Sequence, residues 1–264
     1  MTNGSLQRYL NLFSNIKNWP RYFSQKSDQT FKPVTFETRA GITFEVPTRE
    51  LYLVFKEIFM TDFYSINDWA KSLPERPVIV DVGANAGYFS ILMMSKRPDA
   101  TIYAYEPIER NFTLFGENIK RNVAMTGHVH LFHRAVTGAP TDEITLYKEA
   151  DSANSVTASV YKDFESHNLT AVKVKAISLS VILEANKLSR IDFLKLDCEG
   201  SEYPIVYESD QSVWKSINSV FLEVHDLDKE KRNYTFMNEF LQNMGYQTTA
   251  QLANNGCHAL YAWR

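Results

Sequence analysis

Cysteine is scarce in this chain of 264 residues, which contains only Cys198 and Cys257. Two cysteines that lie far apart in the sequence do not build a disulfide framework or a zinc site. Long hydrophobic runs are also missing, since no stretch approaches the roughly 20 apolar residues that span a bilayer. The first residues lack the apolar core of a signal peptide. We therefore expect a cytoplasmic protein without a transmembrane segment.

An excess of positive charge is missing as well. The 28 lysines and arginines are balanced by 31 aspartates and glutamates, which gives a formal net charge of -3. This balance gives no electrostatic reason to expect nucleic acid as the main partner. Hydrophobic residues make up 44% of the chain, which is enough for an ordinary globular core. A chain of this length fits one α/β domain with additions.

The most informative stretch runs from Pro77 to Ser90. It begins with the apolar run Val78 to Val80, continues with Asp81 and the glycines Gly83 and Gly87, and then reads as a helix. This order is typical of a buried parallel strand that turns sharply into a helix. The unpaired N–H groups at the start of such a helix can bind a ligand. The spacing is Gly-x-x-x-Gly, which differs from the Gly-x-Gly-x-x-Gly pattern of dinucleotide-binding proteins.

A second signal lies about one strand-and-helix unit downstream. The stretch Thr101–Tyr105 predicts another strand, and Glu106 and Pro107 follow it directly. An acidic side chain at the tip of the second strand is well placed to accept hydrogen bonds from ribose hydroxyls. The two signals together predict a nucleoside-bearing cofactor rather than a purely structural unit.

Three motifs carry a family resemblance. They are Asp81–Ser90, Tyr105–Pro107 and Leu194–Glu202, and in this order they resemble the FkbM family of S-adenosylmethionine-dependent methyltransferases. The resemblance extends roughly from Glu57 to His225. One departure is Cys198, which stands where the family pattern has an aliphatic residue, and a buried free cysteine packs as a small hydrophobe.

The resemblance implies the cofactor, the acceptor and the binding residues. The cofactor would be S-adenosyl-L-methionine, and the reaction would methylate a hydroxyl on a sugar, glycan or polyketide-like small molecule. The residues expected to bind the cofactor are Asp81, Gly83, Ala84, Asn85, Gly87, Tyr88, Phe89, Glu106, Pro107, Ala135 and Asp197.

The order of predicted elements indicates the fold. Alternating strands and helices predict an α/β protein with a mostly parallel sheet and helices on both faces. Two final strands, 246–252 and 257–263, are joined by a stretch with hairpin-turn composition and add an antiparallel edge. This is the class I methyltransferase (Rossmann-like) arrangement, which the resemblance implies as well. An N-terminal helix and hairpin extend it.

We expect three parts along the chain. Residues 1–30 form an N-terminal helical extension, and residues 31–76 form a hairpin and helix that cap the cofactor site. Residues 77–264 form the methyltransferase domain, with a hairpin insertion near residues 141–177. The polar loop Asp151–Ser155 within this insertion is either a rim of the substrate site or an ordinary solvated loop.

The candidate catalytic residues fall at predicted strand ends, where open α/β sheets bind their ligands. Lys195 and Asp197 are two positions apart, as are Glu223 and His225, so each pair shares one face of its strand. His225 is our first candidate for the general base, oriented by Glu223, because an imidazole titrates near neutral pH. Asp197 is the second candidate for the base, or else a ligand of the methionine amino group or the substrate. A structural hydrogen bond is the alternative role of His225.

We expect no metal ion in the reaction. His128, His130 and His133 do not share one face of a strand, so they do not form a metal site. Convergence of Asp197 and Glu199 in three dimensions would leave a metal possible. Two alternative functions remain at this point. The first is an NAD(P)-dependent oxidoreductase or sugar epimerase, which the glycine spacing disfavours, and the second is a non-catalytic module that binds a nucleoside cofactor.

Overall fold

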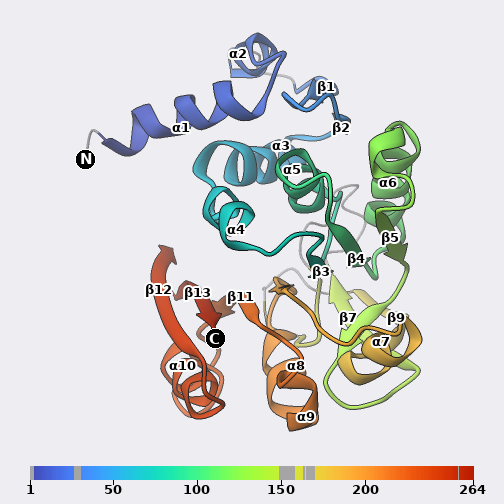
Figure 1. Ribbon diagram of the computed structural model, residues 1–264, viewed down its shortest axis with the longest axis vertical. Coiled ribbons are helices and arrows are strands. Elements are labelled where there is room, and N and C mark those ends of the chain that lie inside the picture. Colours follow the sequence, from blue (N-terminus) through green and yellow to red (C-terminus); the bar gives the residue numbers. More distant parts are fainter. Residues whose placement is uncertain (1–2, 27–30, 149–157, 163, 165–169, 255) are drawn as a thin grey trace.

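The structure is a computed structural model that describes residues 3–26, 31–148, 158–162, 164, 170–254 and 256–264. Its centre is a seven-stranded sheet with the order β12-β13-β11-β10-β3-β4-β5 (Figure 1). Strand β13 runs antiparallel to both of its neighbours, and the strands from β11 to β5 are parallel to one another. The strands are β3 (Val78–Val82), β4 (Thr101–Tyr105), β5 (Val129–Phe132), β10 (Phe193–Leu196), β11 (Ser219–His225), β12 (Gln247–Asn254) and β13 (Cys257–Trp263).

The order in which the chain adds strands to the sheet reverses beside β3. The chain passes outward from β3 to β4 and β5, and then returns to build β10 and β11 on the other side of β3. The crevice at the carboxyl ends of β3 and β10 is therefore a topological switch point, where sheets of this kind bind ligands. The mostly parallel sheet with an antiparallel C-terminal hairpin confirms the predicted class I methyltransferase fold.

Alternate residues of each strand pack into two separate hydrophobic cores. Ile79 and Ile102 pack into one hydrophobic cluster, whereas Val80 and Leu194 pack into the other, because successive side chains point to opposite faces. In Figure 1, helices α3 to α6 lie on one side of the sheet and α7 to α10 on the other. These helices are α3 (Arg49–Lys56), α4 (Ile66–Ser72), α5 (Tyr88–Lys96), α6 (Glu109–Lys120), α7 (Leu179–Ala185), α8 (Glu202–Glu208), α9 (Gln211–Trp214) and α10 (Tyr234–Asn243).

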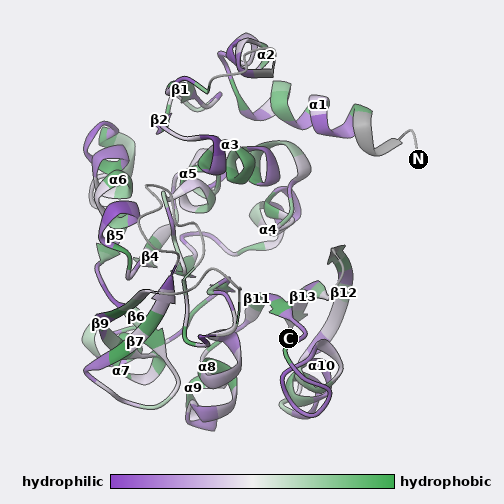
Figure 2. Ribbon diagram, turned by 180° about the vertical axis from the view of Figure 1, so that it is seen from behind, coloured by the Kyte–Doolittle hydropathy of each residue, from purple (hydrophilic) through white to green (hydrophobic). Residues whose placement is uncertain are grey.

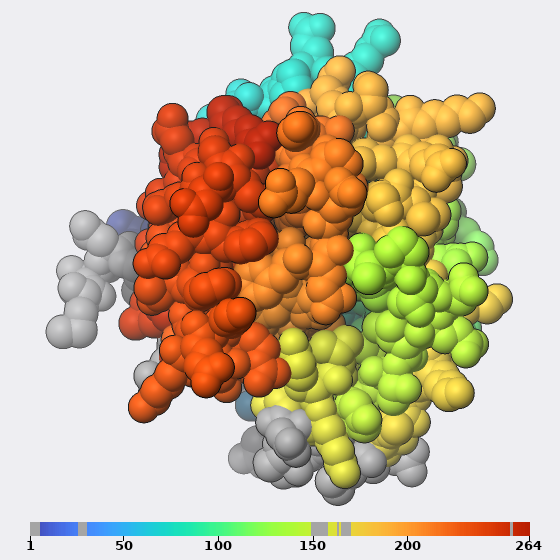
Figure 3. Space-filling model, turned by 90° about the horizontal axis from the view of Figure 1, so that it is seen from below, coloured from blue at the N-terminus to red at the C-terminus, as the bar shows by residue number. Residues whose placement is uncertain are grey.

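The C-terminal part of the chain forms much of the face that carries α8 to α10. Seen from below, this part, in orange to red, forms a continuous surface beside the green and yellow segment around β7 (Figure 3). The hydropathy colouring shows hydrophobic residues on strands such as β4, β11 and β13, between the two helical layers (Figure 2). No helix in the described part of the chain has both the length and the apolar character needed to cross a bilayer.

The N-terminal segment packs on the outside of α5. It contains α1 (Asn3–Asn15), α2 (Pro20–Lys26) and the antiparallel pair β1 (Val34–Glu37) and β2 (Thr43–Val46). The next element after α3 is η1 (Glu57–Thr61), a π-helix. The side-chain amides of Asn11 and Asn15 donate hydrogen bonds to the carbonyls of Met60 and Phe59, so α1 is tied directly to this π-helix.

A column of phenylalanine rings fixes α3 and η1 against the hairpin. The rings of Phe36 and Phe55 stack with centroids 4.2 Å apart, and those of Phe44 and Phe59 stack at 4.8 Å. The hydroxyl of Tyr88 at the start of α5 then donates a 2.7 Å hydrogen bond to the carbonyl of Glu45 in β2. The position of η1 is therefore set from both sides.

A second, four-stranded sheet has the order β6-β9-β7-β8. As predicted, β7 (Glu143–Lys148) and β9 (Thr170–Ser178) pair antiparallel. The loop Asp151–Ser155 lies outside the described residues. The stretch from His128 to Val136 reads as one strand in the sequence, but it is interrupted after Phe132, so β5 and β6 (Ala135–Thr137) belong to different sheets. The remaining elements are β8 (Ala158–Ser159) and the 3-10 helix η2 (Val123–Met125).

Candidate functional site

A cavity of about 350 Å³ lies where the switch point predicts a ligand. Its walls come from the loop after β3, the tip of β4, the ends of β10 and β11, and from α3 and η1. Most of the predicted cofactor residues line it, while Asp81 and Gly87 are not among its described lining residues. The predicted residues that do line it are Gly83, Ala84, Asn85, Tyr88, Phe89, Glu106, Pro107, Ala135, Lys195, Asp197 and Glu223.

The two glycines of the loop are required by neighbouring protein atoms. Gly83 has a φ of +73°, and a Cβ there would lie 1.9 Å from the carbonyl oxygen of Asp197. Gly87 has a φ of +85°, and its Cβ would lie 2.1 Å from the ring of Phe115. Only glycine fits such close approaches at positive φ. The absence of side chains thus lets the loop after β3 pass directly against the end of β10.

Glu106 is held rigidly at the tip of β4. Its side chain is buried, with one oxygen accepting the Asn85 amide N–H at 2.7 Å and the other accepting the Ile108 amide N–H at 2.8 Å. Burial raises the pKa of Glu106 to about 7, although the two amides and Lys195 pull it down. The Asn111 side chain also donates a hydrogen bond to Glu106, so of the roughly four acceptor positions of a carboxylate about one is left for a ligand hydroxyl.

Lys195 lies beneath the loop as a buried cation. Its Nζ donates a 2.8 Å hydrogen bond to the Gly83 carbonyl and lies 3.3 Å from Asp81 Oδ1 and 3.4 Å from Asp197 Oδ2. Burial by itself lowers the pKa of Lys195, but the carboxylates of Asp81 and Asp197 outweigh it and hold the pKa above the usual value. Lys195 therefore stays protonated and fixes the loop.

Asp81 has an internal role as well. Its Oδ2 accepts a 2.7 Å hydrogen bond from the hydroxyl of Ser90, and the residue is fully buried. The motif aspartate thus joins β3 to α5 and to Lys195. Asp81 was predicted to bind the cofactor, but its side chain points into the protein, against Ser90 and Lys195.

Asp197 and Glu223 share a proton on the cavity wall. Asp197 Oδ2 accepts a 2.6 Å hydrogen bond from the Tyr64 hydroxyl, and the Asp197 and Glu223 carboxyl groups are hydrogen-bonded to each other. Burial would raise the pKa of Asp197, but Lys195 and the hydrogen bonds from Glu223 and Tyr64 lower it overall. Burial and the adjacent Asp197 charge raise the pKa of Glu223 well above its usual value. The shared proton therefore belongs to Glu223.

Glu57 is a wall residue that the sequence analysis missed. It comes from η1 and lines the cavity. Burial raises the pKa of Glu57 to about 7, the Asp197 charge adds to this, and Lys195 opposes it. In the sequence it reads as one more residue of an amphipathic helix, whereas π-helical turns are rare and occur frequently at functional sites. Tyr64 was missed for a similar reason, since an aromatic residue in a connecting segment reads as core.

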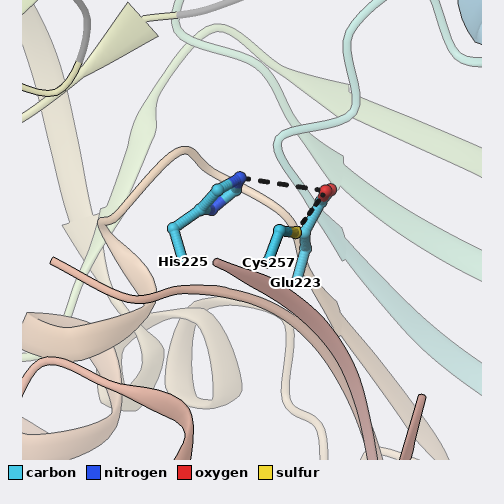
Figure 4. Close-up of side chains that lie close together, drawn as sticks. All are labelled: Glu223, His225 and Cys257. Carbon is cyan, nitrogen blue, oxygen red and sulfur yellow. Dashed lines mark hydrogen bonds and ion pairs between the residues drawn. The ribbon is translucent and has the colours of Figure 1, made fainter. Parts of the chain in front are cut away.

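His225 lies behind this wall. Its Nε2 is 3.8 Å from Glu199 Oε2 and 3.9 Å from Glu223 Oε1, and the thiol of Cys257 donates a 3.2 Å hydrogen bond to Glu223 (Figure 4). Gaps of this size between nitrogen and oxygen are too long for hydrogen bonds. His225 is also not among the described residues that line the cavity. The structure thus brings His225 and Glu223 together as predicted, but without the orienting hydrogen bond.

Comparison with known proteins gives consistent matches. A family profile described as the methyltransferase FkbM domain matches residues 81–248. Methyltransferase sdnD from Sordaria araneosa is 30% identical over 200 residues, which cover 66% of this chain and 74% of that protein. The 31-O-demethyl-FK506 methyltransferase FkbM from Streptomyces tacrolimicus is 24% identical over 203 residues, which cover 68% of this chain and 76% of that protein. A solved structure, methyltransferase FkbM from Methylobacillus flagellatus KT, aligns with 14% identity and a TM-score of 0.49, covering 81% of this chain and 53% of that one.

Proposed function

Because this chain belongs to the FkbM family of methyltransferases, we propose that it transfers a methyl group from S-adenosyl-L-methionine to a hydroxyl group. The acceptor class is a sugar, glycan or polyketide-like small molecule. The name of one relative, a 31-O-demethyl-FK506 methyltransferase, supports oxygen as the acceptor atom. The observation that carries the proposal is the buried Glu106 carboxylate, which is fixed by two backbone amides beside the cavity.

The chain's residues fit the nucleoside part of this cofactor. Glu106 offers an acceptor position for a ribose hydroxyl, and Gly83 and Asn85 form the adjoining wall. Apolar side chains suited to a flat base line the same cavity. They are Ile108, Ala135, Val136 and Leu146. Bound S-adenosyl-L-methionine would supply an electrophilic methyl group attached to a sulfonium sulfur.

Methyl transfer to a hydroxyl releases a proton, and a base on the protein accelerates the step by accepting it. The acceptor oxygen forms a bond to the methyl carbon, the carbon–sulfur bond breaks with its electrons going to sulfur, and the hydroxyl proton must leave. Close in-line positioning of the two reactants supplies much of the rate increase. A general base adds about 10²–10⁴-fold.

Glu57 is the best proton acceptor among the wall residues. Asp197 already accepts hydrogen bonds from Tyr64 and Glu223, and Glu223 holds a proton of its own. Glu57 lines the cavity and has a pKa of about 7, which is close to the ideal value for a general base at neutral pH. We therefore assign the base to Glu57 in place of His225.

A thermal-shift panel tests the cofactor. S-adenosylmethionine and S-adenosylhomocysteine should raise the melting temperature, whereas NAD and NADP should leave it unchanged, because a ligand that binds the folded state alone stabilises it. Stabilisation by NAD or NADP alone would instead favour the oxidoreductase or epimerase. Cofactor binding without methyl transfer to any hydroxyl acceptor would favour a non-catalytic module.

Binding of S-adenosylhomocysteine should tighten as the pH rises through about 7. Below this pH Glu106 is protonated in the free protein, and the ribose hydroxyls bind best to its ionised form. Glu106→Gln should weaken binding roughly 5- to 150-fold, equivalent to about 1–3 kcal/mol, and should remove this pH dependence. Calorimetry between pH 5.5 and 8.5 measures both effects. Unchanged affinity in Glu106→Gln would place the ribose elsewhere.

A further inference from the structure

Three potential metal ligands meet where β11 and β13 lie side by side. We call Glu223, His225 and Cys257 the β11–β13 cluster. His225 and Cys257 are direct partners in the antiparallel register, and Glu223 lies two residues before His225 on the same strand. One oxygen, one nitrogen and one sulfur atom from these side chains all lie within 4.8 Å of one another (Figure 4).

The distances within the cluster are close to those between ligands of a common ion. Two atoms bound tetrahedrally to one zinc ion at bonds of about 2.0–2.3 Å are roughly 3.3–3.6 Å apart. The Sγ to Oε1 distance is 3.2 Å, and the Nε2 of His225 is 3.9 Å from the same Glu223 oxygen. The buried Nδ1 of His225 has no hydrogen-bond partner among the described residues.

The carboxyl groups around the cluster also favour binding of a cation. Asp197, Glu199 and Glu223 lie together, and the nearest lysine, Lys195, already pairs with Asp81 as well as Asp197. The carboxylates of Asp197 and Glu199 would stabilise a dication bound at the cluster.

We propose that Glu223, His225 and Cys257 bind a divalent transition-metal ion, and that Zn²⁺ is the ion that fits best. Carboxylate, imidazole and thiolate are zinc ligands, and three protein ligands with one open position are typical of catalytic zinc sites. Binding converts the Cys257 thiol to a thiolate and the Glu223 carboxyl to a carboxylate, and the two protons leave to solvent. The ion stays divalent throughout.

An ion held by this cluster would lie next to the cavity wall. Glu223 belongs to both the cluster and the cavity wall, and Glu199, whose Oε2 is 3.8 Å from His225 Nε2, lines the same wall. A hydroxyl oxygen bound to the ion would become more acidic and would be held in place for Glu57. This role rests on the proposed function, whereas the ion site itself does not. The site was not predicted from the sequence, because the chain has only two cysteines and Cys257 is 34 residues from Glu223.

Metal titrations of the chelator-treated full chain test the site without a methyl donor. Zn²⁺ should bind with one-to-one stoichiometry by calorimetry, releasing protons, and Co²⁺ should show a thiolate-to-cobalt charge-transfer absorption. Cys257→Ser should abolish this absorption, and His225→Ala should weaken Zn²⁺ binding roughly tenfold or more. Cys198→Ser and His130→Ala are the matched controls, and both should retain the absorption and the affinity.

Circular dichroism of each variant establishes that it is folded before titration. If Cys257→Ser does not fold, the result with His225→Ala decides, since His225 has lower burial and a smaller role in packing. A folded wild type that gives no charge-transfer absorption with Co²⁺ overturns the proposal, as does unchanged Zn²⁺ affinity in His225→Ala. Binding of S-adenosylhomocysteine, measured separately, reports on the methyltransferase proposal, so the two can fail independently.

Discussion

Glu57→Gln should lower kcat by about 10²–10⁴-fold while the affinity for S-adenosylhomocysteine stays near the wild-type value. Glutamine keeps the shape of the side chain but cannot accept the acceptor's proton. Glu57 lies on the cavity wall near Asp197 and Lys195 and has a pKa of about 7, and the other wall carboxylate with such a pKa, Glu106, is assigned to the ribose. Steady-state kinetics and calorimetry on the same preparations measure the two quantities.

The pH dependence separates a base from a merely structural residue. As the pH rises through about 7, Glu57 loses its proton and wild-type kcat should rise, whereas Glu57→Gln should lose this rise. The raised pKa also means that folding favours protonated Glu57. Its stabilisation is present below the unfolded pKa near 4.5 and is lost as the pH rises to about 7, so Glu57→Gln should be more stable than wild type above pH 7.

Two further variants sharpen this test. Glu57→Asp keeps a carboxylate and should recover part of the lost activity. Glu50→Gln removes a carboxylate from the same cavity wall, and its kcat should fall less than tenfold. A folded Glu57→Gln enzyme with near-wild-type kcat on its acceptor would return the role of base to the Glu223 and His225 side of the cavity.

Gly83→Ala should be the most destabilising single methyl addition in the cofactor loop. The new Cβ would lie 1.9 Å from the Asp197 carbonyl oxygen, which is a backbone atom that cannot rotate away, and the φ of +73° adds strain. We expect a loss of roughly 3–5 kcal/mol in the free energy of unfolding, which combines overpacking with left-handed strain. Urea denaturation of the purified variants measures this loss of stability. Failure of Gly83→Ala to yield folded protein would also indicate severe destabilisation.

Gly41→Ala provides the matched control for backbone strain. Gly41 has a similar φ of +85° but no atom within 4 Å of its Cβ position. Its replacement by alanine should therefore lower the free energy of unfolding by only about 1–2 kcal/mol, because it adds backbone strain but no overlap with other atoms. Equal losses at the two positions would show that the close approach of the β3 loop to β10 does not constrain Gly83.

The part of the cavity formed by the loop after β3 and the tip of β4 could be predicted from the sequence because its signals are local. The loop after β3 and the acid after β4 are short, continuous motifs, and most of the residues predicted from them line the cavity, while Asp81 and Gly87 do not. Strand and helix periodicity also located the mostly parallel sheet. The division into residues 1–30, 31–76 and 77–264 and the assignment of individual ligands stay predictions.

The acceptor side could not be predicted because it is assembled from distant elements. Glu57 is on a π-helix, a geometry with no period of its own in the sequence, and Tyr64 comes from the segment that follows it. Cys257 meets Glu223 only through the antiparallel register of β13. Burial also changes what side chains can do. Lys195 looked like a catalytic candidate at a strand end, but its carboxylate partners make it a fixed structural cation.

The hydrogen bond from Tyr64 to Asp197 has a consequence for folding. Its two residues are 133 positions apart, so forming this contact in an unfolded chain costs a large loop-closure entropy. The cost becomes small once the sheet has formed and holds the two residues near each other. Refolding chains should therefore acquire their parallel strands before the acceptor wall forms. Recovery of methyl transfer after dilution from denaturant would then follow complete folding, whereas the recovery of helical and strand signals would precede it.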